Sequence, residues 1–191
     1  MENEAVGRRE ALAKDILILS RNTLLVNLRF LDLALSRFAL VPVPPLNPLL
    51  LESIAVDGAI DALFSDEVRD IVILTCKTEN ESILTPHLVN GGYPAGKKTI
   101  RFTTCRKFKG LEADAVILVD VDKTTFTGND GQNVLLYYVG TSRARLRLDV
   151  IAQLDDNDCL AVLEALGKAG KAKRPRRDLA RALNAVAQIA D

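Results

Sequence analysis

Several residue types that mark particular classes of protein are scarce in this sequence. Its 191 residues include three cysteines, one histidine and no tryptophan. The cysteines, Cys76, Cys105 and Cys159, are far apart and have no CxxC spacing, which argues against a disulfide framework and against a zinc site. The single histidine, His87, has no cysteine cluster or paired carboxylate near it in the sequence, so we expect a structural or exposed side chain. We predict no metal site and a cytoplasmic protein.

The sequence also lacks an excess of charge of either sign and a long apolar run. Lysine and arginine total 25, and aspartate and glutamate total 25, so the whole molecule has no field that would attract nucleic acid or a membrane. The most apolar early stretch, residues 24–43, is interrupted by Arg29, Asp32 and Arg37, and the charged residues before it are unlike a signal peptide. We expect no membrane partner, and any attraction for nucleic acid must come from local clusters of charge.

The apolar residues of the first third have a helical spacing. Between residues 8 and 40 they recur at intervals of three and four, which predicts an amphipathic helix. The prolines of VPVPPLNP, residues 41–48, end that pattern and predict an extended connector. A second helical pattern covers residues 49–64.

Short runs of β-branched and aliphatic residues follow, and they predict buried strands. The runs are DIVILT at 70–75, KTIRFTT at 98–104, DAVILVDVD at 114–122 and RLDVIAQ at 147–153. The segments ENESILTPHLV and GQNVLLYYVGTSRARL, after the first and third runs, are each long enough for a crossover helix. We therefore expect a parallel α/β sheet flanked by helices. DCLAVLEALGKAG and KAKRPRRDLARALNAVAQIA predict two further helices near the C-terminus.

These patterns divide the chain into three parts. We assign residues 1–47 to an N-terminal helical extension with a proline-rich connector, residues 48–155 to one α/β domain, and residues 156–191 to a C-terminal helical, basic extension. The last part has two interpretations, a tail that contacts phosphates and solubilising charge before a docking helix. Its basic cluster consists of Lys171, Lys173, Arg174, Arg176 and Arg177.

The segment GGYPAGKKTI, residues 91–100, has the glycine and lysine spacing of a phosphate-binding loop. Such a loop needs Ser or Thr directly after its lysine and must open a helix. Here Lys98 follows Lys97 and a strand pattern comes next, so we interpret the segment as a turn that leads into a strand. Without a phosphate loop there is no metal ion for the strand-end aspartates to hold, and we interpret Asp120 and Asp122 as ordinary strand-end carboxylates.

Two other segments contain residue types suited to phosphate and nucleotide. In GTSRA, small and hydroxyl-bearing residues surround Arg143, whose guanidinium can make bidentate contacts with an anion; the alternative is a surface ion pair. In RKFKGLE, Gly110 permits the close approach of a ligand, and Arg106, Lys107 and Lys109 form a basic cluster able to contact a nucleic-acid backbone. The alternatives there are a turn before a strand and a solvated run of charge.

The order and content of these segments resemble the fifth and sixth motifs of the UvrD/Rep-like superfamily 1 helicases. TTCRKFKGLEADAVILVDVD, residues 103–122, contains Thr104 and then Lys-Gly-Leu-Glu before a strand, as in the fifth motif. LLYYVGTSRARLRL, residues 135–148, contains the Tyr-Val-Gly-x-Ser-Arg-Ala of the sixth motif. The resemblance covers about residues 65–155. It implies that residues 48–155 form the C-terminal RecA-like domain of such a DNA helicase, with a P-loop NTPase-like sheet.

The resemblance implies a role for each residue that matches a motif. Arg143 would be the arginine finger, the catalytic contribution of this domain, which reaches the γ-phosphate of ATP across a cleft between two RecA-like domains. Glu112 would accept a hydrogen bond from the ribose. Further nucleotide contacts would come from Gly110, Gly140 and, in the weaker fourth motif, Lys77. Contacts with the DNA backbone would come from Thr104, Arg106, Lys107 and Lys109, with arginine at position 106 where histidine is common in the family.

The resemblance also implies that this chain supplies half of a nucleotide site. The phosphate loop and the acidic pair that hold ATP and Mg²⁺ belong to the family's N-terminal RecA-like domain, and neither occurs in these 191 residues. We therefore expect ATP and Mg²⁺ to be shared with such a partner domain, single-stranded DNA as the other partner, and no appreciable ATP hydrolysis by the isolated chain. Two alternatives stay open: a non-catalytic nucleic-acid- or partner-binding module derived from a helicase domain, and a self-contained nucleotide-binding protein that uses Gly96 and Lys97.

Overall fold

A computed structural model describes residues 24–26, 48–128, 131–168 and 173–183. The strands in these residues form one six-stranded sheet in the order β1-β6-β5-β2-β4-β3. The four central strands run parallel to one another, and each of the two edge strands is antiparallel to its neighbour. The predicted α/β class is therefore confirmed, with a mixed, mostly parallel sheet. The strands are β1 (Leu24–Val26), β2 (Ile71–Thr75), β3 (Gly92–Ala95), β4 (Lys98–Thr104), β5 (Ala113–Val121) and β6 (Ala144–Ala152).

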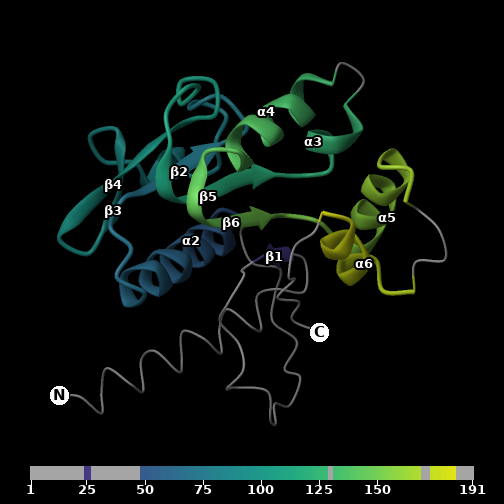
Figure 1. Cartoon of the computed structure of the whole chain (residues 1–191), viewed down its shortest axis with the longest axis horizontal. Helices are drawn as coiled ribbons and strands as arrows, with labels where there is room; N and C mark the ends of the chain where they lie inside the picture. The colour runs from purple at the N-terminus through teal and green to yellow at the C-terminus, as the bar shows by residue number, and fades with distance from the viewer. Residues whose placement is uncertain (1–23, 27–47, 129–130, 169–172, 184–191) are drawn as a thin grey trace, which may run out of the picture.

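Helices cover both faces of this sheet (Figure 1). α2 (Pro48–Ser65) lies on one face, α3 (Thr124–Thr127) and α4 (Gln132–Thr141) lie on the other, and α5 (Asp156–Ala165) and α6 (Pro175–Ala182) form a pair beyond the end of β6. All five residues of β2 are buried, as expected for a parallel strand covered on both faces. Within the described part of the chain, no helix has the length and apolar character needed to span a bilayer.

The connection between β2 and β4 differs from the prediction. Instead of a crossover helix, it contains a single 3₁₀ turn, Thr85–His87, and then β3, which pairs antiparallel with β4 as the first strand of a hairpin. Pro86 and the left-handed backbone of Asn90 and Gly91, with φ of 50° and 76°, end any helical continuation. Because β3 returns the chain to the start of β4, β2 and β4 are parallel without a helix between them. The other predicted crossover helix is confirmed as α4.

The segment GGYPAGKKTI forms part of this hairpin. Gly92–Ala95 is β3, Gly96 has a left-handed φ of 63° in the turn, and Lys98 begins β4. The segment opens a strand and not a helix, so no set of helix N-terminal amides forms there to hold a phosphate. The interpretation as a turn before a strand is confirmed, and the turn is preceded by a strand of its own.

The N-terminal prediction is wrong at one place. Residues 24–26 form β1, which pairs antiparallel with β6 through Leu24↔Ala152 and Val26↔Val150, so no helix runs continuously from residue 8 to residue 40. The remainder of that predicted helix and the connector at 41–47 lie outside the described residues. The second predicted helix is confirmed as α2, and the two C-terminal helices are confirmed as α5 and, in its described part, α6.

Candidate functional site

The predicted site residues lie at two opposite edges of the parallel sheet. At one edge, which we call the amino edge, Ala113 at the start of β5 pairs with Ala144 at the start of β6. At the other, the carboxyl edge, Thr75 at the end of β2 pairs with Thr104 of β4 and Val119 of β5. Because β5 has nine residues, its ends are about 26 Å apart at about 3.3 Å per residue. Residues at the two edges cannot contact the same small ligand.

The two helicase-like motifs meet at the amino edge. The amide of Ala113, which directly follows Glu112, donates a 3.1 Å hydrogen bond to the main-chain carbonyl of Arg143. Glu112 is exposed. Gly110 has a left-handed φ of 85°, and a Cβ placed there would meet no atom within 4 Å, so its backbone conformation and not crowding favours glycine. The geometry thus brings Gly110, Glu112 and Arg143 to one edge of the sheet, as the motifs predict.

The guanidinium of Arg143 folds back onto the C-terminal end of α4. Its Nε donates to the carbonyl of Val139 at 3.2 Å and to Oγ of Ser142 at 3.2 Å, and Nη2 donates to the same Oγ at 2.9 Å. Oγ of Ser142 in turn donates to the carbonyl of Val139 at 3.0 Å. These bonds satisfy a carbonyl that the end of a helix leaves without an intrahelical partner. The arginine is therefore paired with neutral oxygens, and among the described residues no carboxylate forms an ion pair with it.

Gly140 has a structural reason to be glycine. It is buried, and a Cβ at this position would come within 2.7 Å of Cδ1 of Leu118 and 2.8 Å of Sγ of Cys105. The absence of a side chain therefore lets α4 approach β5 closely. Packing alone accounts for this glycine, and a nucleotide contact for it stays a prediction.

The predicted DNA-contacting residues lie at the carboxyl end of β4. Thr104 is buried, and its Oγ1 accepts a 3.2 Å hydrogen bond from the amide of Lys107. Arg106 donates from Nη2 to Oε1 of Gln132 at 3.3 Å, and Nζ of Lys107 lies 2.9 Å from Oε2 of Glu79. Arg106, Lys107 and Lys109 are all exposed. The cluster is therefore open to solvent, although Glu79 partly neutralises it.

Lys77 lies apart from the other predicted nucleotide-binding residues. It follows β2 at the carboxyl edge, where its Nζ is 3.0 Å from a carboxylate oxygen of Asp122. Burial alone would lower the pKa of Lys77, but the hydrogen bond and charge of Asp122 outweigh burial and raise it. The structure thus separates Lys77 from Glu112 and Arg143 by the length of the parallel strands, so these residues do not form one group.

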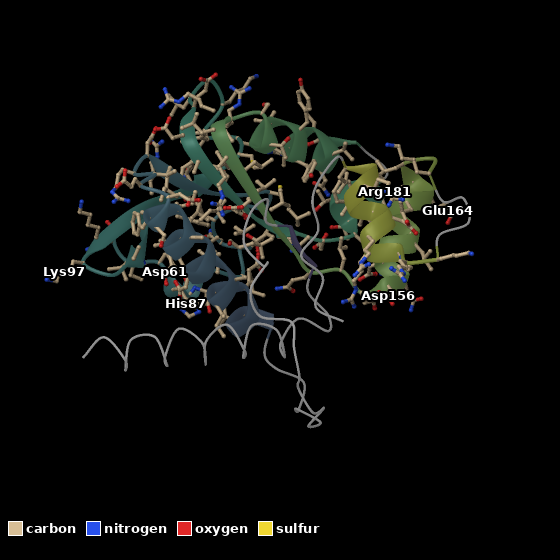
Figure 2. The ribbon with its side chains drawn as sticks, turned by 60° about the horizontal axis from the view of Figure 1, so that its bottom comes forward. Asp61, His87, Lys97, Asp156, Glu164 and Arg181 are labelled. Atoms are coloured by element: carbon tan, nitrogen blue, oxygen red, sulfur yellow. The ribbon has the colours of Figure 1, made fainter. Side chains whose placement is uncertain are left out.

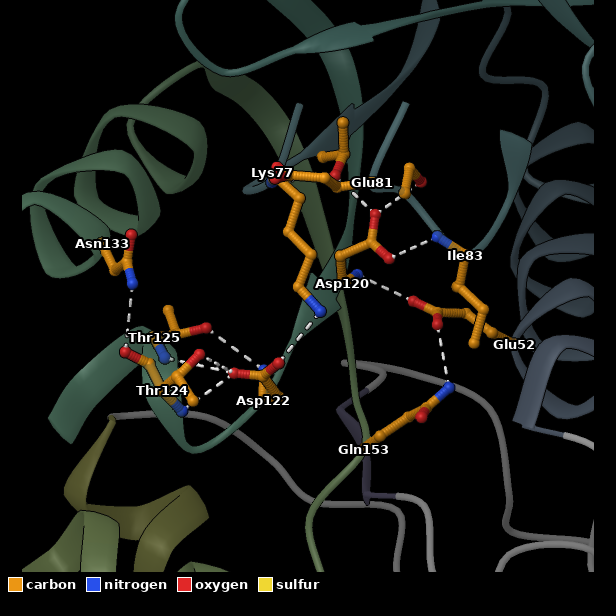
Figure 3. A network of polar contacts seen from close by, with 12 residues as sticks. Glu52, Lys77, Glu81, Ile83, Asp120, Asp122, Thr124, Thr125, Asn133 and Gln153 are labelled. Carbon is orange, nitrogen blue, oxygen red and sulfur yellow. Dashed lines mark hydrogen bonds and ion pairs between the residues drawn. The ribbon is translucent and has the colours of Figure 1, made fainter. Parts of the chain in front are cut away.

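Asp120 belongs to a buried polar network at the carboxyl edge (Figure 3). The interpretation of Asp120 as an ordinary strand-end carboxylate missed this network. Asp120 is 5% exposed and has a left-handed φ of 59° at a register shift in β5. Its carboxylate accepts hydrogen bonds from the hydroxyls of Thr75 and Ser82 and from the amide of Ile83, the last at 2.9 Å. A bulge of this kind re-aims a side chain. Here it turns Asp120 toward the connection that follows β2 and fixes that connection to the sheet.

Glu52 of α2, the helix on one face of the sheet, is also part of this network. It is 1% exposed; Oε1 accepts the amide hydrogen of Asp120 at 2.7 Å, and Oε2 accepts from Nε2 of Gln153 at 2.9 Å. Burial, and next the charge of Asp120, raise the pKa of Glu52 to about 8. The signal in the sequence is a glutamate inside the apolar run LLLESIAV, but only the folded structure shows its partner.

Metal-binding and cysteine chemistry find little support in the part of the chain that the structure describes. No group of three or more histidine, cysteine, aspartate or glutamate side chains there is arranged to hold a metal ion. Cys76, Cys105 and Cys159 are buried free thiols. His87 is half-buried at the end of the 3₁₀ turn. What the amino edge offers instead is an exposed carboxylate, a glycine turn and an arginine, groups suited to a ribose and a phosphate.

Comparison with known proteins identifies one family. Residues 99–151 match the family model of the UvrD-like helicase C-terminal domain. The matched segment runs from the second residue of β4 to the last but one residue of β6 and contains all of β5 and α4, so it includes both motifs on which the resemblance rests. No curated protein and no solved structure matches this chain. The resemblance drawn from the motifs is confirmed.

Proposed function

We propose that this chain, which carries a UvrD-like helicase C-terminal domain, acts as the part of an ATP-dependent DNA helicase that supplies the arginine finger and contacts to single-stranded DNA. The observation that carries the proposal is the meeting of the two motifs at the amino edge. One main-chain hydrogen bond, from Ala113 to Arg143, fixes the backbone that follows Glu112 to the backbone that follows α4. A site built from one such edge is half of a nucleotide site, and the other half comes from a partner RecA-like domain with a phosphate loop.

In this proposal each residue at the amino edge acts on a different part of ATP. Glu112 accepts a hydrogen bond from the ribose. Arg143 leaves its hydrogen bonds to Val139 and Ser142 and places its charge near the γ-phosphate, where it stabilises the negative charge that develops in phosphoryl transfer. Mg²⁺ bound with ATP neutralises the phosphates when the partner domain holds both. This chain's own contribution is the guanidinium and the orientation of the nucleotide.

Exposed apolar side chains near the amino edge are an argument for an interface with a partner domain. Leu111 is 49% exposed, Tyr138 is 66% exposed and Leu146 is 75% exposed. Leu111 lies between Gly110 and Glu112, and the other two lie within five residues of Arg143 on either side. A domain interface would remove these side chains from water, which is favourable in proportion to the apolar area covered.

The loop between β4 and β5 offers a short connection between nucleotide and DNA. It begins at Thr104 on the carboxyl edge and ends at Glu112 on the amino edge. Its exposed cations would contact the backbone of a single strand without reading sequence. A shift of the amino edge when the two domains close around ATP would therefore reach the DNA contact through one segment of chain.

ATP hydrolysis by the chain alone, and by the chain mixed with the first RecA-like domain of a UvrD-like helicase, tests the proposal. We expect no turnover by the chain alone and DNA-stimulated turnover in the mixture. Arg143→Ala should lower that turnover by about 10³-fold or more. Arg145→Ala is the matched control, because Arg145 is a half-exposed arginine two residues away that pairs with Asp70 and Asp114. Turnover in the mixture that is insensitive to Arg143→Ala would contradict the arginine-finger role.

The second candidate function is a non-catalytic binding module. The separation of Lys77 from Arg143 favours it, because the fourth motif then brings no cation to the amino edge. A module of this kind would bind single-stranded DNA with the same affinity before and after Arg143→Ala, and no partner domain would restore ATP hydrolysis. ATP turnover by the chain alone would exclude both candidates.

A further inference from the structure

The charges of this chain are unevenly distributed along it. Residues 168–181 contain seven cationic residues and one carboxylate, Asp178, whereas the whole chain has 25 residues of each sign. The other residues therefore contain 18 cations and 24 carboxylates. A basic segment in an otherwise acidic chain indicates an anionic partner at that place. The seven cations are Lys168, Lys171, Lys173, Arg174, Arg176, Arg177 and Arg181.

α6 presents part of this charge on a firmly supported helix. Its inner side is fixed by Leu179, which is fully buried in the cluster that also contains the buried side chains of α5, and Ala180 beside it is buried too. Arg176 ties the start of α6 to α5, because its Nε lies 2.8 Å from a carboxylate oxygen of Asp156. The buried side chains and the ion pair between Arg176 and Asp156 therefore hold α6 against α5.

The outer side of α6 carries arginines at helical spacing, together with Asp178, whose carboxylate lies 4.0 Å from Nη1 of Arg181. Arg177 and Arg181 are four residues apart and lie on one side of α6, and Arg174, three residues before Arg177, is the residue that precedes the helix. All three are exposed, and the side chain of Arg181, which is labelled in Figure 2, has a relative exposure of 87%. Lys173 adds a fourth exposed cation directly before them. A row of guanidiniums suits bidentate contacts with successive phosphates.

This row belongs to the same edge of the sheet as the predicted DNA-contacting loop. β6 ends at the carboxyl edge and leads into α5, on which α6 packs (Figure 1). Lys123, at the carboxyl end of β5, pairs with Asp158 of α5 at 3.1 Å, and Arg106 reaches Gln132 at the start of α4. In the strand order, β4 and β6 are three steps apart, about 14 Å at about 4.8 Å per step. That figure separates the ends of β4 and β6, and α6 lies farther out, beyond the end of β6, so one extended single strand must follow this edge of the sheet to contact both places (Figure 1).

We infer that the outer face of α6, formed by Arg174, Arg177 and Arg181, is a second contact for the backbone of single-stranded DNA, beside the loop at 104–109. The inference extends the proposed function, and it concerns helices outside the segment that matches the helicase family. An anionic membrane fits this face less well. The apolar side of α6 is already buried in the core, so the helix has no apolar face to insert into a bilayer.

Binding of the full chain to an oligothymidylate of about 20 nucleotides, measured by fluorescence anisotropy over a series of salt concentrations, tests this surface. The test variant is Arg174→Ala/Arg181→Ala. The matched control is Lys97→Ala/Lys98→Ala, which removes two exposed cations from the hairpin turn at the opposite end of the molecule (Figure 2). Each lost phosphate contact lowers the salt slope by about 0.7 for a single strand, so the test variant should lose about 1.4 in slope and roughly 25-fold in affinity at 0.1 M salt. The control should bind like the unmodified chain.

Each result decides the inference separately from the proposed function. If Arg106→Ala/Lys107→Ala/Lys109→Ala weakens binding but the α6 variant matches its control, the α6 surface is wrong and the proposed function stands. If the unmodified chain does not bind the oligonucleotide, the α6 surface is wrong, and ATP turnover in the mixture with a partner domain still decides the proposed function. Binding to anionic phospholipid vesicles that depends on Arg174 and Arg181, without binding to DNA, would assign the face to a membrane and overturn the inference. Circular dichroism checks folding, and Arg174→Gln/Arg181→Gln replaces the alanine variant if α6 unfolds.

Discussion

The main-chain amide of Asp120 donates a 2.7 Å hydrogen bond to Oε1 of Glu52, so the bulge in β5 and the first half of α2 meet through a buried carboxyl group. Asp120 lies at the carboxyl edge of the sheet, and its own carboxylate holds the connection after β2. A glutamate that is 1% exposed beside an aspartate is costly when both are ionised. The protonation of Glu52 therefore affects the stability of the whole domain.

We expect the stability of the domain to fall between pH 5 and pH 8 because of Glu52. Its pKa is raised from 4.5 to about 8 in the folded protein, so the folded state keeps a proton that the unfolded chain releases. The resulting stabilisation is complete below about pH 4.5 and is lost as the pH rises toward 8, at about 1.4 kcal/mol per pH unit at most.

Glu52→Gln should remove this pH dependence. Glutamine keeps a carbonyl oxygen for the amide of Asp120 and does not titrate. The difference in free energy of unfolding between the variant and the unmodified chain should shift in favour of the variant by about 2–4 kcal/mol between pH 5 and pH 8. Urea unfolding at several pH values measures it. If the free energies of unfolding of the two proteins changed with pH in the same way, Glu52 would be ionised in the folded state.

Asp120→Ala should destabilise the domain more than Asp120→Asn. Both variants alter the acceptor for Thr75, Ser82 and Ile83, but asparagine keeps one oxygen and tolerates the φ of 59°, whereas alanine does neither well. We expect a loss of about 1–2 kcal/mol for asparagine and about 3 kcal/mol or more for alanine. Asp114→Asn, at a surface ion pair, is the control and should cost less than about 1 kcal/mol. Equal losses for Ala and Asn would mean that neither the remaining oxygen nor the left-handed backbone at residue 120 affects stability.

Gly140→Ala tests the close contact between α4 and β5. A new Cβ would lie 2.7 Å from Cδ1 of Leu118 and 2.8 Å from Sγ of Cys105, so the helix must move outward or the side chains must repack. We expect a loss of about 1–3 kcal/mol in the free energy of unfolding, measured in urea. Leu135→Ala, at a position 59% exposed on the same helix, should change stability by less than about 0.5 kcal/mol. If Gly140→Ala leaves the free energy of unfolding unchanged, packing does not explain this glycine, and the predicted nucleotide contact becomes its explanation.

Much of the sheet could be predicted because the signals are local. β4 has the predicted bounds, 98–104, and β5 differs from its predicted bounds by one residue at each end. A continuous apolar run such as AVILV is typical of a strand in a parallel sheet, because such a strand is buried on both faces. β1 could not be predicted, because a three-residue apolar run has no periodicity of its own and takes its structure from pairing with β6. The hairpin of β3 and β4 was missed because a loop of that length also accommodates a helix.

The sequence predicts the parts of the site that consist of residues close together in the chain. It does not predict the parts that only the tertiary structure brings together. Gly110, Glu112 and Arg143 share the amino edge because a short loop and a helix end lead into adjacent strands. Lys77 was placed with them by motif order, but order along the chain does not say at which edge of a sheet a residue emerges. The pairing of Glu52 with Asp120 joins residues far apart in sequence through a bulge, and no local pattern specifies it.

Glu79→Gln should strengthen binding to single-stranded DNA if the loop at 104–109 contacts the backbone. Nζ of Lys107 lies 2.9 Å from the carboxylate of Glu79, so this pair holds a cation that a phosphate would otherwise engage. Lys109 is exposed and has no such carboxylate in the described residues. We therefore expect Lys109→Ala to weaken binding more than Lys107→Ala, and Glu79→Gln to tighten it about 2- to 5-fold at low salt, since one freed contact adds about 0.7 to the salt slope.

Glu81→Gln is the matched control for this prediction. It removes the same charge from the same connection, but the carboxylate of Glu81 is held by the hydroxyl and amide of Thr78 and does not pair with the cluster. Anisotropy with an oligothymidylate between low and moderate salt measures all four variants. Equal effects of Glu79→Gln and Glu81→Gln would mean that net charge alone sets the affinity, whereas a response limited to Glu79 requires a phosphate at Lys107. The loop would then bind DNA at its carboxyl end while its other end carries Glu112, so occupancy of the two edges would be linked through eight residues, 105–112.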